Sequence, residues 1–119
     1  MGNNRRKGHG FERIVRLKWR EHGWEKAETS RYASREKDDQ KVDLCYTDPY
    51  NVQCKSVQAI NLHTVLSEMP DDDNMNIVFH KRNRKGVIVA MSEDTFWVLV
   101  RMHQLMQKTA TLLLSKKDV

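Results

Sequence analysis

The chain has 119 residues, of which 39% are hydrophobic and 31% charged, and its formal net charge of +5 favours a polyanionic partner. This length suits one domain with a single core. We expect neither a membrane partner nor a secretory signal, because the sequence holds no long apolar run and no signal pattern. Cys45 and Cys54 lack the density of a disulfide scaffold and the CxxC spacing of a structural zinc site, so we expect reduced thiols in the core of a cytoplasmic protein.

The first half of the chain predicts a helix followed by three strands. Residues 1–8 are polar and basic, and we expect them to form a flexible arm. Apolar residues then recur at helical spacing from Gly10 to His22, and Gly23 supplies a stop. The rest of this half predicts a first strand, an exposed polar loop and a hairpin whose strands flank the turn 47–49; these elements fall at residues 24–30, 31–41, 42–46 and 50–57.

The second half predicts a short helix, two strands joined by a basic turn, a long helix and a frayed tail, at residues 59–69, 75–80, 86–91, 95–114 and 115–119. Ser92 is a plausible N-cap for the long helix, because Glu93 and Asp94 follow it in the first turn. Residues 9–114 would form the single domain. The order α-β-β-β-α-β-β-α indicates an α/β fold with a central mixed β-sheet flanked by helices.

The terminal helix is apolar on more than one face, with Phe96, Trp97, Leu99, Val100, Met102, Leu105 and Met106 followed by three leucines. One interpretation is a helix buried against the sheet. The other is a helix shared between the core and a second subunit, because one small sheet cannot cover so wide an apolar belt. We therefore expect a homodimer formed through the C-terminal helix or a sheet edge.

The hairpin places polar side chains on strands that are otherwise apolar. Gln53 and Lys55 share one face of the second strand, whereas Val52 and Cys54 share the other and suit the core. Asp43 joins Gln53 and Lys55 if the register sets it opposite Gln53, which pairs Cys45 with Asn51; a slip of one residue would turn Asp43 to the other face.

With that register, a carboxylate, an amide carbonyl and an ammonium converge. Carboxylate and carbonyl oxygens are ligands that Mg²⁺ or Mn²⁺ accepts, and a metal-bound water becomes a usable nucleophile. A neighbouring lysine can orient that water or offset charge that develops on a phosphate. This equipment suits phosphodiester hydrolysis. The alternative is an ordinary surface hairpin with polar residues on its wet face.

The arrangement Asp43…Gln53-x-Lys55 on a hairpin resembles the PD-(D/E)xK nuclease superfamily, with Gln53 where Glu or Asp is commoner. Residues 7–15, KGHGFERIV, resemble the KGxxxER-x-V start of the archaeal-type Holliday junction resolvases and their phage relatives. Residues 77–82 and 87–98 also follow the pattern of that family, so the resemblance covers most of residues 7–100. It implies a restriction-endonuclease-like core.

The resemblance also implies roles for individual residues. Asp43 would be the principal metal ligand, Gln53 a neutral second ligand, and Lys55 the group that acts on the attacking water or the scissile phosphate. Glu12 would complete the site from the first helix; the alternative is a solvated acid paired with Arg16 at i+4. Mg²⁺ is the implied cofactor, with Mn²⁺ as a substitute.

Gln53 departs from the family pattern, because it removes one negative charge from the site and weakens the binding of a hard dication. Asp38 and Asp39 precede the aspartate strand and either compensate for that charge or are plain loop acids. The departure favours a tuned site, and it keeps a catalytically silent DNA-binding protein as an alternative.

Basic residues are distributed so that they could follow several phosphates of branched or duplex DNA. The candidate contacts are Arg5, Arg6 and Lys7 in the arm, Arg31 and Arg35 in the polar loop, and Lys81, Arg82, Arg84 and Lys85 in the basic turn. The resemblance adds Ser30 and Arg31 as phosphate contacts, for which a plain polar loop is the alternative. No recognition helix is visible, so we expect DNA shape to be recognised rather than sequence.

These observations predict a Mg²⁺-dependent, structure-selective DNA endonuclease that resolves Holliday junctions or other branched DNA, encoded by a phage and active in the host cytoplasm. Three alternatives remain. The first is a restriction- or nicking-type nuclease of the same superfamily that cuts ordinary duplex DNA. The second is a non-catalytic DNA-binding protein with a retired nuclease fold. The third is a protein-interaction module that uses the apolar terminal helix.

Overall fold

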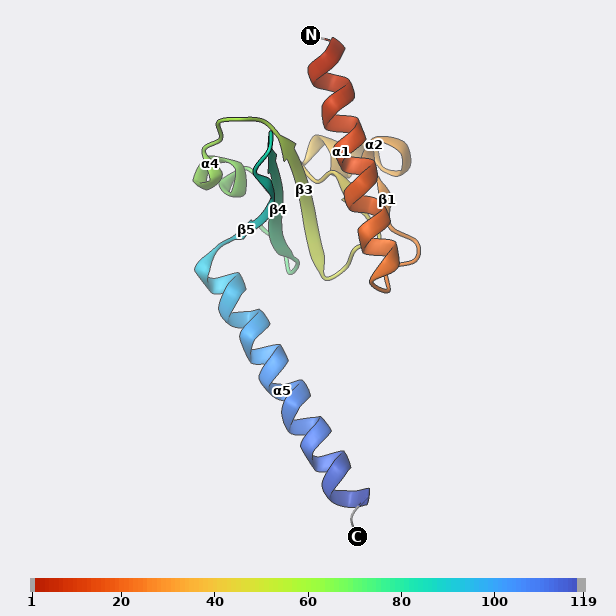
Figure 1. The fold of residues 1–119 in the computed structure, drawn as a ribbon, viewed down its shortest axis with the longest axis vertical. Coiled ribbons are helices and arrows are strands. Elements are labelled where there is room, and N and C mark those ends of the chain that lie inside the picture. The colour runs from red at the N-terminus through yellow and green to blue at the C-terminus, as the bar shows by residue number, and fades with distance from the viewer. Residues whose placement is uncertain (1, 118–119) are drawn as a thin grey trace.

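A helix packed on a small mixed sheet forms the body of the protein, and a second long helix leads away from that body (Figure 1). The computed structural model describes residues 2–117, with side chains from Lys7 to Lys116. The elements in chain order are α1 (Gly2–Glu21), β1 (Glu28–Thr29), α2 (Ser30–Ala33), α3 (Arg35–Asp39), β2 (Leu44–Cys45), β3 (Tyr50–Ser56), α4 (Leu62–Ser67), β4 (Met75–Arg82), β5 (Gly86–Met91) and α5 (Glu93–Lys117).

The described strands form two sheets. In the larger one, β4 lies between β3, to which it is parallel, and β5, to which it is antiparallel. In the smaller one, β1 and β2 pair antiparallel. The parallel crossover from β3 to β4 contains α4, which lies on the opposite side of the strands from α1 (Figure 1). The expected α/β class with a mixed sheet and flanking helices is therefore confirmed.

The core lies between α1 and the sheet. Phe11, Val15 and Trp19 recur every four residues along α1, so they share one face of the helix and all three are buried. They pack in one cluster with Leu44, Val52, Cys54 and Ile77, and Trp24, Tyr50 and Phe79 border it. The alternation predicted for β3 thus holds on this face, and both cysteines are buried and unpaired as expected.

Two expectations for the N-terminal third are wrong in secondary structure. Helix α1 begins at Gly2 rather than near Gly10, so it includes residues 2–8 of the segment that we expected to form a flexible arm. Residues 31–41 are not a plain loop, because they contain α2 and α3. Ser34 starts α3 by accepting the Lys37 backbone N–H on its side chain, a local capping interaction that stabilises a short helix even in a polar segment. The observed order is α-β-α-α-β-β-α-β-β-α.

The predicted hairpin register is also wrong. Within the described chain β2 pairs with β1, and β3 pairs with β4, so no ladder joins β2 to β3. The Asp43 N–H instead donates to the Val52 carbonyl at 2.8 Å, one residue from the predicted partner Gln53. The next backbone donor on β3, the Cys54 N–H, donates to Asp43 Oδ2 at 2.7 Å. A side chain therefore takes the place of a ladder hydrogen bond, and the ladder stops there.

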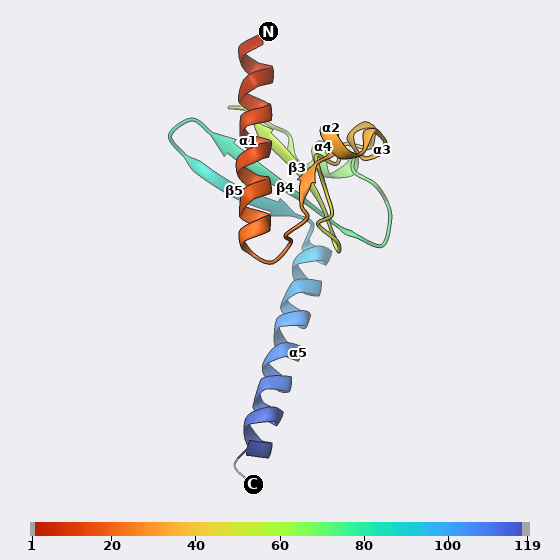
Figure 2. The ribbon, with the colours of Figure 1, turned by 90° about the vertical axis from the view of Figure 1, so that its right-hand side faces the viewer.

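Helix α5 extends away from the body in both views (Figures 1 and 2). Its N-cap is the predicted one, since Ser92 Oγ accepts the Thr95 N–H at 3.1 Å. Its 25 residues correspond to about 37 Å at 1.5 Å per residue, and the helix continues through residues 115–117 of the expected tail. The interpretation of α5 as a helix buried against the sheet is wrong, because its large apolar side chains are exposed.

Among residues 2–117, no helix combines the length and the apolar character needed to cross a membrane.

The core assignment predicts a large difference between two apolar residues of α1. Phe11→Ala should lower the free energy of unfolding by about 3–5 kcal/mol, because it leaves a cavity between α1 and the sheet. The control is Leu17→Ala on the same helix, where the side chain is half exposed and the loss should be about 1 kcal/mol or less. Urea denaturation of both variants measures the difference; equal losses would contradict this packing.

Candidate active site

Asp43 is where the two sheets meet. Its N–H donates to the Val52 carbonyl on β3, and its carbonyl accepts the Ser30 N–H at 2.7 Å. Its carboxylate accepts the Cys54 N–H, which fixes the side chain at the edge of β3 within electrostatic reach of Lys55. Burial raises the pKa of Asp43, while the Cys54 N–H and the Lys55 charge oppose that rise. Three hydrogen bonds to backbone groups thus hold Asp43, and its carboxylate is largely shielded from solvent.

Glu12, on α1, lies within electrostatic reach of Asp43. Burial raises its pKa from 4.5 to about 7, and the second largest cause is the charge of Asp43. In the described chain, Glu12 Oε2 is buried and has no hydrogen-bond partner, and its closest cation is Arg31 Nε at 3.7 Å. The alternative pairing of Glu12 with Arg16 is wrong, because Arg16 binds Glu28 at 2.8 Å.

Gln53 and Lys55 are two residues apart on β3 and therefore lie on the face opposite Val52 and Cys54. Lys55 is half-buried, and its positive charge lowers the pKa of Asp43 against the larger effect of burial. Gln53 is only 4% exposed, and no group among the described residues bonds its Oε1. A buried polar atom without a hydrogen-bond partner costs free energy. A ligand that bonded Gln53 Oε1 or Glu12 Oε2 would remove that cost.

Asp38 is an additional acid near these groups. It lies in the last part of α3, and its charge raises the pKa values of both Glu12 and Asp43. The sequence suggested either a compensating acid or a plain loop acid at this position. Its influence on both carboxylates favours the first interpretation for Asp38, whereas no contact among the described residues links Asp39 to the site.

The side chains here fit a hard divalent cation. The described residues hold no cluster of three His, Cys, Asp or Glu arranged around a common point, so a metal would take two carboxylates, Glu12 and Asp43, and one neutral oxygen. Gln53 Oε1 is buried and unpartnered, but no contact among the described residues joins Gln53 to Glu12 or Asp43, so Gln53 stays a predicted third ligand. Oxygen ligands of this kind, completed by water, suit Mg²⁺ or Mn²⁺.

The predicted DNA contacts form two groups. Lys7 Nζ donates to Asn83 Oδ1 at 2.8 Å, so α1 contacts the turn between β4 and β5. This turn and the end of β4 carry the exposed Arg82, Arg84 and Lys85 and the half-buried Lys81. Arg31 and Arg35, both exposed, lie on α2 and α3, and Arg31 contacts Glu12 at 3.7 Å. The side chains of Arg5 and Arg6 lie outside the part of the chain whose side chains are described.

Ser30 does not fit the role that the resemblance implied. It is fully buried, and its hydroxyl lies 3.2 Å from Cys45 Sγ in a hydrogen bond. Its N–H also binds the Asp43 carbonyl. A side chain so placed cannot touch a phosphate at the surface. Ser30 instead helps to fix the backbone of Asp43 through its N–H.

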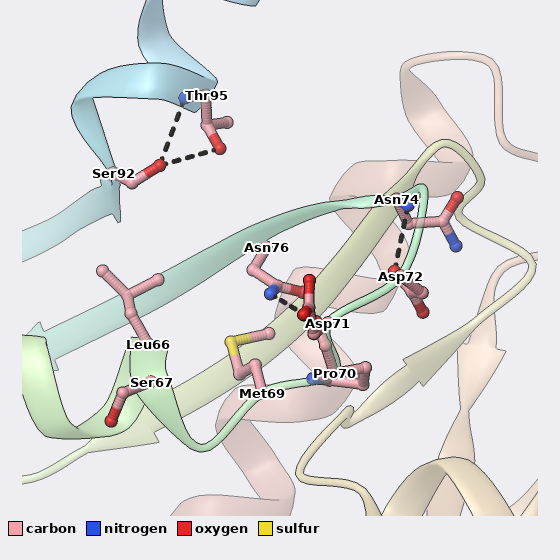
Figure 3. A pocket seen from close by; sticks show the side chains of 10 residues that line it. All are labelled: Leu66, Ser67, Met69, Pro70, Asp71, Asp72, Asn74, Asn76, Ser92 and Thr95. Atoms are coloured by element: carbon pink, nitrogen blue, oxygen red, sulfur yellow. Dashed lines mark hydrogen bonds between the residues drawn. The ribbon is translucent and has the colours of Figure 1, made fainter.

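A second acidic region lies at the start of β4, between α4 and the first turn of α5 (Figure 3). It is a hollow lined by the apolar Leu66 and Met69 and by polar residues that include Asp71 and Asp72. Several of its polar groups are used internally: Asp72 Oδ1 accepts the Asn74 N–H at 2.9 Å, and Asn76 Nδ2 donates to the Pro70 carbonyl at 2.8 Å. These bonds hold the loop before β4, and we assign the hollow no part in the site around Asp43.

Comparison of the chain with protein-family models, with curated proteins and with solved structures finds no match. Interpretation of the site therefore depends on its own geometry.

The raised pKa of Glu12 predicts a pH-dependent cost to the metal-free fold. Glu12 is neutral in both folded and unfolded chains well below pH 4.5 and charged in both above about pH 7, so its cost to the fold grows as the pH rises through that window and is fully present above it. Glu12→Gln should raise the free energy of unfolding at pH 8 by about 1–3 kcal/mol, with the gain vanishing near pH 4.

Thermal or urea denaturation in EDTA at several pH values measures this effect. Glu36→Gln is the matched control, since it makes the same change at an exposed position of α3 and should give no such pH-dependent gain. A loss of stability in Glu12→Gln at pH 8 would contradict the burial that we infer for this carboxylate.

Proposed function

We propose that this protein is a Mg²⁺-dependent endonuclease that hydrolyses phosphodiester bonds in branched DNA. The observation that supports the proposal best is that Asp43, at the edge of β3, lies within electrostatic reach of both Glu12 and Lys55. Two buried oxygens, Glu12 Oε2 and Gln53 Oε1, also lack hydrogen-bond partners in the described chain. The resemblance to PD-(D/E)xK nucleases and Holliday junction resolvases agrees with this choice of residues, including the Gln53 variant of the motif.

The side chains divide the work of hydrolysis. A bound Mg²⁺ would polarise the phosphate and lower the pKa of a coordinated water. Asp43 and Glu12 would hold the cation with their charges, and Gln53 with its amide oxygen. Lys55, beside Asp43 on the same edge, would orient the attacking water and stabilise charge on the phosphate. Glu12 must lose its proton for this, so its pKa of about 7 couples cation binding to pH.

The distribution of basic side chains supports a DNA substrate. The turn between β4 and β5 and the Lys7 side chain form one basic surface, and Arg31 contacts Glu12 in the candidate site. Phosphate contacts of this kind supply affinity and position but carry no sequence information. A protein that reads the backbone from two separate places selects DNA by shape, which favours branched DNA over a uniform duplex.

Cleavage of a labelled four-way junction and of its matching linear duplex tests this proposal. With Mg²⁺ or Mn²⁺, wild type should cut the junction and spare the duplex. Asp43→Asn and Lys55→Ala should each lower the rate by at least about 100-fold, the scale of losing one group that stabilises developing charge. Asp71→Asn, the same change in the acidic hollow of Figure 3, should retain activity.

Other outcomes would favour the alternatives. Equal cutting of junction and duplex would indicate a restriction- or nicking-type nuclease. Tight binding of the junction without cutting in either metal would indicate a non-catalytic DNA-binding protein. Absence of any salt-dependent DNA binding would indicate a protein-interaction module.

A second copy of the chain is the partner that best fits α5. Leu99, Met102, Met106 and Leu113, with Thr109 between the last two, recur at alternating spacings of three and four residues, the pattern of a helix–helix seam. All but Leu99 among these apolar side chains are well exposed, and Met106 is 71% exposed. In the described structure α5 has no neighbour that covers this seam (Figure 2).

The charges of α5 favour an antiparallel arrangement. Glu93 and Asp94 lie in its first turn, whereas Lys108 and Lys116 lie in its second half. Two antiparallel copies bring each acidic end beside a basic region of the other helix, whereas parallel copies place like charges together. A two-fold dimer of this kind would present two sites to two DNA strands. The edge strand β5, with Val87, Ile88 and Val89 exposed, is the alternative interface and lacks this complementarity.

The dimer proposal predicts that a charge in the seam separates the copies. The double variant Met106→Lys/Leu113→Lys should shift the protein from dimer to monomer and raise the dissociation constant at least about tenfold, because each lysine would lose its hydration in an apolar contact. Gln104→Lys, on the opposite face of α5, is the control and should remain dimeric. Sedimentation velocity measures the shift; a wild type that stays monomeric at every concentration would refute the dimer.

A further inference from the structure

A groove beside Glu12 is not used by the hydrolytic residues. It lies between α1 and the segment of β1 and α2, has a volume of about 250 Å³, and is lined by Arg13, Arg16, Glu28, Thr29, Arg31 and Tyr32. Three arginines and one exposed aromatic ring thus share a surface with a single carboxylate. The resemblance named only Arg31 among these residues as a DNA contact.

The groove has an excess of positive charge. Glu28 is its one acid, and both Arg16 and Arg20 bind that carboxylate, at 2.8 Å and 3.1 Å. Arg13 is exposed and, within the described chain, has no ion-pair partner, while Arg16 Nε is buried without an acceptor. Arg31 has only the long 3.7 Å contact with Glu12. Guanidinium groups with unused donors are suited to phosphate oxygens.

Tyr32 supplies the aromatic surface. Its side chain is 84% exposed, more than any other large apolar or aromatic side chain in the described part of the chain. No other ring packs against it in that part of the chain. An exposed ring next to arginines is the combination on which unpaired bases stack while their phosphates are neutralised.

The groove adjoins the candidate active site. Arg31 contacts Glu12, and Arg13 follows Glu12 directly on α1, so the same two elements form the site and the groove. A DNA strand whose phosphate lies at Asp43 and Glu12 would therefore continue into the groove with the next nucleotide. Within a paired duplex that base is covered by its neighbours and cannot stack on a protein ring.

We propose that this groove binds one unpaired nucleotide adjacent to the scissile phosphate, with Arg13 and Arg31 on its phosphate and Tyr32 stacked on its base. The inference depends on the proposed nuclease function for the identity of the neighbouring phosphate. It gives the protein a means of selecting branch points, flaps and tails, since these offer a base that is free to stack. Tyr32 is then a specificity residue rather than a group that acts on the reacting atoms.

The test measures binding in EDTA, so no cleavage is required. The probes are a fluorescein-labelled hairpin duplex with a single-stranded 3′ tail and the same duplex with a blunt end. Tyr32→Ala should weaken binding of the tailed probe about tenfold, the scale of one lost base–aromatic stack, and leave the blunt probe unchanged. Tyr32→Phe should bind both probes like wild type, because the ring is kept.

Tyr46→Ala is the matched control, since Tyr46 is also exposed but lies outside the groove. A 2-aminopurine base moved along the tail gives a second readout: wild type should quench its fluorescence at one position, and Tyr32→Ala should restore it. The inference is overturned if Tyr32→Ala binds the tailed probe as well as wild type, if it weakens both probes equally, or if no tail position is quenched. Because the assay needs no metal, a protein that cuts no DNA could still satisfy it.

Discussion

The structure depends on the three backbone contacts of Asp43. Its N–H joins β3, its carbonyl joins the start of α2 at Ser30, and its carboxylate caps the Cys54 N–H. These bonds connect the two sheets at one residue and set its carboxylate against β3. The same arrangement brings Glu12 from α1 to it, because Phe11 and Val15, the neighbours of Glu12 on the helix, are anchored in the core. The fold and the site thus share one anchor.

That anchor has a cost for the metal-free protein. Burial raises the pKa values of Asp43 and Glu12, and two buried oxygens have no hydrogen-bond partner in the described chain. A protein selected only for stability would replace such groups with apolar or paired ones. Buried carboxylates with raised pKa values are instead typical of sites that bind a cation or move protons. The unsatisfied oxygens are therefore the features that a hydrolytic function explains and a purely structural role does not.

The sequence predicts the parts of this architecture that local patterns encode. The alternation of Val52 and Cys54 against Gln53 and Lys55 follows from the strand period, and the bounds of β5 and the Ser92 cap follow from turn and capping residues. The register of Asp43 could not be predicted, because a side chain replaces a ladder bond there and periodicity carries no sign of it. Asp38 could not be placed either, since its position depends on α3, a short helix in a polar segment. The apolar residues of α5 indicate a partner but not where the helix points.

Binding of Mn²⁺ to the protein alone tests the central claim most directly. Isothermal titration at pH 7.5, repeated in two buffers of different ionisation enthalpy, reports both the stoichiometry and the protons released. We expect saturable binding at one site per chain with release of part of a proton from Glu12, weakened at least about tenfold by Gln53→Ala through loss of a ligand oxygen. Absence of saturable binding, or binding that Asp43→Asn leaves unchanged, would contradict the account.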